Sequence, residues 1–161
     1  MYGHKEGAQI LLENGARDDM LSAAARGDLE AMEELISPSG HASSAIDVVN
    51  TPNRGGETPL MWATNLGHVE AMKLLFQHKA KADHRDQHGF TALMGASQHG
   101  HLGAIRLLVK ERADINATEP EDGETPLMMA MHCARSDAVA LLLELGAEKP
   151  PDFNESEAEA H

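Results

Sequence analysis

The chain has 161 residues, a formal net charge of -13 and one cysteine. This length suits one domain with a sizeable core, and a single cysteine excludes an internal disulfide. The acidic balance argues against nucleic acid as a partner, because no basic stripe exists to displace counterions. No apolar run approaches the ~20 residues of a membrane span, and no signal peptide is recognisable, so we predict no membrane insertion and a cytoplasmic location, with the nucleus as an alternative.

The first third of the chain predicts short helices joined by glycines. Residues 3–16 read GHKEGAQILLENGA, and residues 20–37 read MLSAAARGDLEAMEELIS around Gly27. The connector 38–50 is about seven residues longer than the later ones, and its small polar residues predict a loop. An insertion of this kind is either a tolerated loop or part of a binding face.

The centre of the chain repeats one pattern three times. Residues 58–79 read TPLMWATNLGHVEAMKLLFQHK, and related segments begin at Thr91 (TALMGASQHGHLGAIRLLVKER) and Thr125 (TPLMMAMHCARSDAVALLLELG). The steps between these threonines are 33 and 34 residues. A period of this length is typical of stacked repeat arrays.

Each unit predicts two short helices. Thr58 suits an N-cap, Pro59 suits the first helical position, and Gly67 suits the left-handed turn that ends a helix. The first helix is expected over residues 59–66 and the second over 68–78. The apolar stripe of the second helix is Val69, Met72, Leu75 and Phe76. Because two such helices cannot bury their apolar faces alone, neighbouring units must stack.

The three units resemble the ankyrin repeat family, whose pattern G-x-T-P-L-H-x-A-A-x-x-G-H is matched from Gly56, Gly89 and Gly123. The resemblance implies an all-α ankyrin-repeat solenoid of stacked helix-turn-helix units with short projecting hairpin or loop fingers. It predicts a single domain over residues 1–149, and residues 150–161 are expected to be an acidic, disordered tail. The domain is divided into a half-repeat cap at 3–19 and repeats at about 20–49, 53–85, 86–118 and 119–149.

The units depart from the family pattern at a few positions. The histidine after the conserved leucine is replaced by Met61, Met94 and Met128. This change is expected to exchange a hydrogen bond for a soft apolar contact. Lys79 and Arg112 occupy positions where the family prefers glycine, which predicts strained or altered turns. Ala134 and Arg135 replace Gly-His in the last unit, which is typical of a terminal, capping repeat.

The histidines and the cysteine do not form a pattern that predicts catalysis or metal binding. The closely spaced pairs are His84 with His88 and His99 with His101. Zinc needs three or four converging ligands, and the first pair falls in a turn. His68 and His101 match the family's structural Gly-His position. His132 and Cys133 are neighbours in a helix and point about 100° apart. We therefore predict no catalytic residues, no metal and no cofactor.

The resemblance implies a non-catalytic protein–protein interaction module, an adaptor or scaffold that is monomeric on its own. The alternative is a regulatory or targeting domain cut from a larger enzyme or channel. Binding is expected at the finger tips and on the concave face of the first helices. The positions concerned are Arg54, Glu57, Asn65, Leu66, Gln87, His88, Phe90, Gln98, His99, Glu121, Asp122, Glu124, His132 and Cys133.

Two of these expectations concern single residues. Phe90 stands where the other units carry Glu57 and Glu124, so we expect an anchor for a partner rather than a core residue. The alternative is that Phe90 packs locally against Met94. The segment LVKERADIN ends at Asn116 and resembles the site that asparaginyl hydroxylases modify in ankyrin units. The alternative for Asn116 is that it simply fits a turn.

Overall fold

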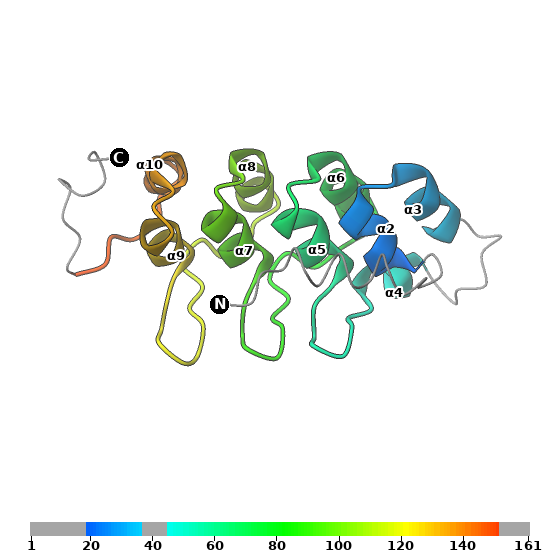
Figure 1. The fold of residues 1–161 in the computed structure, drawn as a ribbon, viewed down its shortest axis with the longest axis horizontal. Helices are drawn as coiled ribbons and strands as arrows, with labels where there is room; N and C mark the ends of the chain where they lie inside the picture. The colour runs from blue at the N-terminus through cyan, green and yellow to red at the C-terminus, as the bar shows by residue number, and fades with distance from the viewer. Residues whose placement is uncertain (1–18, 37–44, 152–161) are drawn as a thin grey trace. The chain divides into compact units, whose positions relative to one another are not determined.

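A computed structural model describes residues 19–36 and 45–151 of the chain, and Figure 1 draws the remaining residues in grey. Within the described ranges every regular element is an α-helix, which confirms the predicted all-α class. The chain divides into two compact units, Met1–Lys81 and Ala82–His161. Most of the half-repeat predicted at 3–19, and the tail from residue 152, lie outside the described residues.

The described part of the first unit, residues 19–36 and 45–81, contains two helix hairpins and one extra short helix. Its elements are α2 (Met20–Arg26), α3 (Leu29–Ile36), α4 (Ala45–Asn50), α5 (Pro59–Asn65) and α6 (Val69–Gln77). Helix α2 packs on α5 and α3 packs on α6, so equivalent helices of successive repeats face each other. The stacked faces bury Met32, Leu60, Met72 and Leu75 completely or almost completely.

Helix α4 corrects the prediction of a loop over residues 38–50. Residues 45–50 form a helix that packs against α3 and α5, and Val49 in it is fully buried. Val48 and Val49 supply apolar side chains that this short helix can pack against its neighbours. The loop was predicted because most of the connector is polar. Residues 37–44 lie outside the described ranges.

The second unit, as far as residue 151, contains two helix hairpins. These are α7 (Ala92–His99) with α8 (Leu102–Lys110), and α9 (Pro126–His132) with α10 (Ser136–Glu144). Helix α7 packs on α9 and α8 packs on α10. The core between them contains Leu93, Ile105, Leu108, Leu127 and Leu142, all at most 1% exposed. The loops that precede α7 and α9 project from the side of the first helices, away from α8 and α10 (Figure 1).

The first helix of each regular repeat begins at a capping threonine. The hydroxyls of Thr58, Thr91 and Thr125 accept the backbone N–H three residues later at 3.4, 3.3 and 3.3 Å. In return, the sulfur atoms of Met61 and Met94 lie 3.5 and 3.4 Å from the backbone nitrogens of Thr58 and Thr91. The expectation of a purely apolar contact is therefore wrong at these two methionines. A thioether is a weak acceptor, but it completes the reciprocal capping box in a buried place.

Helices α6 and α8, the second helices of their repeats, end in strained turns of the usual shape. Lys79 and Arg112 have φ of 67° and 66°, in the left-handed region where the last repeat has Gly146. The N–H groups of Ala80 and Ala113 still close the turn on the carbonyls of Leu75 and Leu108, at 2.9 and 3.0 Å. The backbone thus keeps the turn that glycine favours, and the side chains at these two positions bear a steric cost.

A polar contact at the start of the second helix links stacked repeats within each unit. His68 Nε2 lies 3.1 Å from the carbonyl oxygen of Ala25, and its ring leaves no room for a Cβ on Gly27. In the second unit, Arg135 Nε donates to the carbonyl of Gln98 at 3.1 Å. The structural role predicted for His68 is confirmed. Arg135 provides the equivalent tie in the repeat that lacks Gly-His.

Candidate partner-binding surface

Each regular repeat carries a finger, a tight loop in front of its first helix. We define finger 1 as residues 53–57, finger 2 as 86–90 and finger 3 as 119–124. In each finger the N–H of the first residue donates to the carbonyl of the last, at 2.9 Å (Asn53 to Glu57), 3.0 Å (Asp86 to Phe90) and 3.1 Å (Glu119 to Glu124). Finger 1 belongs to the first unit, and fingers 2 and 3 belong to the second.

The first residue of each finger also holds the loop with its side chain. Asn53 Oδ1 accepts the N–H groups of Gly55 and Glu57, both at 2.9 Å. Asp86 Oδ1 accepts those of His88 and Phe90, again both at 2.9 Å. Because these bonds satisfy the backbone internally, the tip residues are left to face solvent. Arg54, Gln87 and His88 are all exposed.

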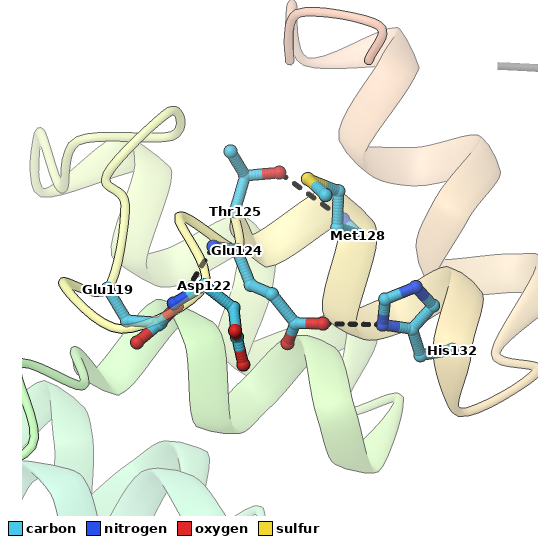
Figure 2. A network of polar contacts seen from close by, with 6 residues as sticks. All are labelled: Glu119, Asp122, Glu124, Thr125, Met128 and His132. Carbon is cyan, nitrogen blue, oxygen red and sulfur yellow. Dashed lines mark hydrogen bonds and ion pairs between the residues drawn. The ribbon is translucent and has the colours of Figure 1, made fainter. Parts of the chain in front are cut away.

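Finger 3 is one residue longer, and a longer side chain holds it. Glu119 Oε2 accepts the N–H of Glu121 at 2.7 Å, and Oε1 accepts those of Asp122 and Glu124 at 2.6 and 3.1 Å. Figure 2 shows part of this network. Glu119 is only 5% exposed, whereas Glu121 and Asp122 at the tip are exposed.

The surroundings of Glu119 favour its ionised form. Its pKa is lowered, first by the hydrogen bond from the Glu121 N–H and then by those from Glu124, Asp122 and Gly123. Burial acts in the opposite direction because it removes the charge from water, but the N–H donors outweigh it. A carboxylate that accepts several backbone N–H groups is the acceptor this loop requires.

The residues at the base of the fingers were not singled out by the sequence reasoning. A signal was nevertheless present, because Asn53, Asp86 and Glu119 recur at steps of 33 residues and all carry an acceptor oxygen.

Fingers 2 and 3 are in direct contact. Arg85 Nη1 donates to the carbonyls of Gly89 in finger 2 and Thr118 beside finger 3, at 3.0 and 2.6 Å. A Cβ built on Gly89 would lie 2.3 Å from Pro120 Cδ, so finger 2 fits against finger 3 only with glycine there. The structure thus brings together the predicted tip residues Gln87, His88, Glu121 and Asp122 on one edge of the second unit.

Phe90 is half-buried and packs in a cluster with Met94, Ala117 and Met129. The cluster includes the contact with Met94 that was the alternative to an exposed anchor. Part of the Phe90 surface is therefore engaged within the unit. The ring is not fully covered, and Phe90 is the only apolar residue among the last residues of the three fingers.

The remaining carboxylates at the finger ends are engaged locally. Glu57 Oε2 accepts from Asn53 Nδ2 at 2.8 Å within finger 1. Glu124 Oε1 lies 2.7 Å from Nδ1 of His132, the last residue of α9 (Figure 2). The His132 side chain is 62% exposed and that of Glu124 is 27% exposed. The pair links finger 3 to the far end of its own helix.

The predicted residues at the ends of α5 and α7 are half-buried. In the first unit, Asn65 is the last residue of α5, and Leu66 after it packs against Ala25 and Trp62. In the second unit, His99 Nδ1 lies 2.9 Å from the carbonyl oxygen of Gly95. The His99 ring stacks on that of His101 with centroids 5.7 Å apart, and Gln98 uses its carbonyl to bind Arg135.

Asn116 performs a structural function. Its Oδ1 accepts the N–H of Glu148 in the following segment at 2.9 Å. Asn50 and Asp83 occupy the same place in the preceding repeats. Their side chains accept the N–H groups of Lys81 and Asp114 at 2.9 and 2.8 Å. Asn116 thus fits its turn as the alternative predicted, and its hydroxylation stays a prediction.

The described residues contain neither a metal-binding cluster nor a membrane-spanning helix. None of the groups formed by three or more His, Cys, Asp or Glu side chains in these ranges is arranged to hold a metal ion. No described helix is both long and apolar enough to cross a membrane. Cys133 is a half-buried free thiol beside His132.

Comparison with known families gives two matches. A family model described as Ankyrin repeats (3 copies) matches residues 20–119, and one described as Ankyrin repeat matches residues 122–153. All of the helices described above lie within these matches. The interval between the two matches, residues 120–121, falls in finger 3, the finger with the additional residue.

Proposed function

Because this chain belongs to the ankyrin repeat family, we propose that it is a non-catalytic module that binds another protein through its fingers and first helices. Ankyrin repeats are generally protein–protein interaction modules. The observation that carries the proposal for this chain is the ordered edge formed by fingers 2 and 3. Its backbone is satisfied internally, and its tip side chains are exposed.

Order in the fingers favours binding. A loop that is already fixed loses little conformational entropy when a partner docks, so more of the contact energy appears as affinity. The contacts available at this edge are the tip residues Gln87, His88, Glu121 and Asp122, with Phe90 and His132 beside them. A partly covered aromatic ring surrounded by polar groups is the usual composition of an interface centre and its rim.

Charge indicates the chemistry of the partner. Fingers 2 and 3 and the residues that flank them carry Asp83, Asp86, Asp114, Glu119, Glu121, Asp122 and Glu124. Arg85 is the only lysine or arginine in residues 83–91 and 114–125, and its guanidinium binds backbone carbonyls. We therefore propose a partner that presents basic side chains to this edge. Binding should then weaken as salt increases, because exposed charges are screened over about 8 Å at physiological ionic strength.

The test is capture with matched variants. Three baits are used: the wild-type full chain, the double variant Glu121→Lys/Asp122→Lys, and the control variant Lys110→Ala. The proteins that each bait captures are compared by mass spectrometry. Lys110 is the exposed last residue of α8, a helix that lies on the side of the unit away from the fingers (Figure 1). A genuine partner is retained by wild type and Lys110→Ala and lost by the charge-reversed variant. Equal capture by all three baits would refute binding at fingers 2 and 3.

A further inference from the structure

We propose that Glu119 is the positioning residue of finger 3, and that its ionised carboxylate fixes the loop that presents Glu121 and Asp122. The inference concerns the conformation of the finger. Its consequence for binding rests on the function proposed above. Glu119 itself is nearly covered, so it acts through the residues it holds rather than by touching a partner.

The first support is the way the carboxylate is used. Both oxygens accept backbone N–H groups of finger 3, at 2.6 to 3.1 Å from Asp122, Glu121 and Glu124. The three N–H groups point at one acceptor, so removing it leaves donors without a partner inside a tight loop. Losing a charged acceptor costs more than losing a neutral one, and the loop would open to let water satisfy its amides.

The second support is the match between side-chain length and loop length. Fingers 1 and 2 contain five residues each and are held by Asn53 and Asp86. Finger 3 contains six residues and is held by a glutamate, which is one methylene longer than aspartate. The additional residue and the additional methylene occur in the same finger. An aspartate at position 119 would be too short to reach all three donors.

The third support is the connection of finger 3 to α9. Glu124 donates its N–H to Glu119 and pairs its carboxylate with His132, and the next residue, Thr125, caps α9 through the N–H of Met128 at 3.3 Å (Figure 2). Glu119 therefore fixes one end of a continuous chain of polar contacts. These contacts connect the tip of finger 3 with both the first turn and the last residue of α9.

The pH dependence of this device follows from its charges. The ionisable groups around Glu119 are Glu121, Asp122 and Glu124 of the same finger, Arg85 of the preceding loop and His132 of α9. The N–H donors lower the pKa of Glu119 in the folded chain. The order it imposes is complete above the ordinary glutamate pKa, about 4.3, and is lost as pH falls through the lower folded value.

The experiment is NMR on the ¹⁵N-labelled full chain. We expect the amide resonances of Glu121, Asp122 and Glu124 to move together on acidification, with a common midpoint below that of an ordinary glutamate. In Glu119→Gln this common transition should disappear. Hydrogen exchange at the three amides should become about tenfold faster or more, as expected for loss of a charged hydrogen bond. The matched control is Glu121→Gln, which removes a carboxylate from the same finger and should leave exchange unchanged.

A rescue variant tests the length match. Glu119→Asp alone should expose the three amides. Combined with deletion of Pro120, it gives the loop D-E-D-G-E, which has the spacing of finger 2, D-Q-H-G-F. Protection should then return at the amides of Asp122 and Glu124. Unchanged exchange in Glu119→Gln would overturn the inference whether or not a partner exists. If the exchange results hold but no partner is captured, only the proposed function fails.

Discussion

Single side chains determine the local geometry of this protein at a few positions. The left-handed turns at Lys79 and Arg112 are the clearest case, because the fold imposes a conformation that L-residues other than glycine avoid. The finger bases are a second case, since one acceptor side chain organises each loop. The residue scale is therefore where stability and loop order can be altered without disturbing the stack.

We predict that Lys79→Gly and Arg112→Gly each stabilise the protein by about 0.5–1 kcal/mol. Relief of a left-handed strain of roughly 1–2 kcal/mol exceeds the entropy cost of glycine, about 0.4–1 kcal/mol. Urea unfolding measures the change. The matched control is Gly146→Ala, where a Cβ meets no atom within 4 Å and φ is 98°, so only backbone strain is added. This control should destabilise, and stabilisation by it would contradict the argument.

A second prediction concerns pH and the stability contributed by Glu119. Its folded pKa is lowered, so its contribution is fully present above the ordinary glutamate pKa and declines as pH falls through the folded value. Glu119→Gln should therefore be less stable than wild type near neutral pH, and the difference should shrink on acidification. Thermal unfolding of both proteins across pH measures this. A difference that grows at low pH would have the wrong sign.

At the scale of the elements, each helix is too short to be stable alone and depends on the apolar face of its neighbours. Buried leucines therefore carry the stack within each unit. In the second unit, α8 contributes Leu108, which is fully buried, while Lys110 two residues later is exposed.

Leu108→Ala should destabilise the protein by about 2–5 kcal/mol, because it leaves a cavity that the surrounding helices cannot fill. Lys110→Ala on the same helix should change stability by less than ~0.5 kcal/mol. Equilibrium unfolding of the two variants compares them directly. Similar losses would mean that the interior and exterior faces of α8 have been assigned wrongly.

The elements also explain how far the sequence alone could reach. The threonine caps and the spacing of apolar residues predicted the helices of the three regular repeats, because both signals are local. Helix α4 was not predicted, because a six-residue helix gives too short an apolar pattern to distinguish it from a polar connector. The role of Glu119 was not predicted either, because it depends on how the loop brings the N–H groups of residues 121, 122 and 124 to the Glu119 carboxylate. The same holds for the sulfur contacts of Met61 and Met94, which need the capping geometry to be recognised.

At the scale of the whole molecule, each of the two units stacks equivalent helices and buries its own core. The second unit presents fingers 2 and 3 in contact, with Glu121 and Asp122 exposed at the tip of finger 3. The second helices α8 and α10 lie on the opposite side (Figure 1). The candidate surface was predictable as a set of positions from the family pattern. Its order was not, because that order comes from side-chain bonds within and between the fingers.

The central claim is that a protein partner docks on fingers 2 and 3. The most direct measurement is hydrogen–deuterium exchange of the full chain with and without the captured partner. The account predicts slower exchange in residues 83–91 and 116–125 and at the ends of α7 and α9, with α8 and α10 unchanged. Slower exchange confined to α8 and α10, with the fingers unaffected, would contradict it.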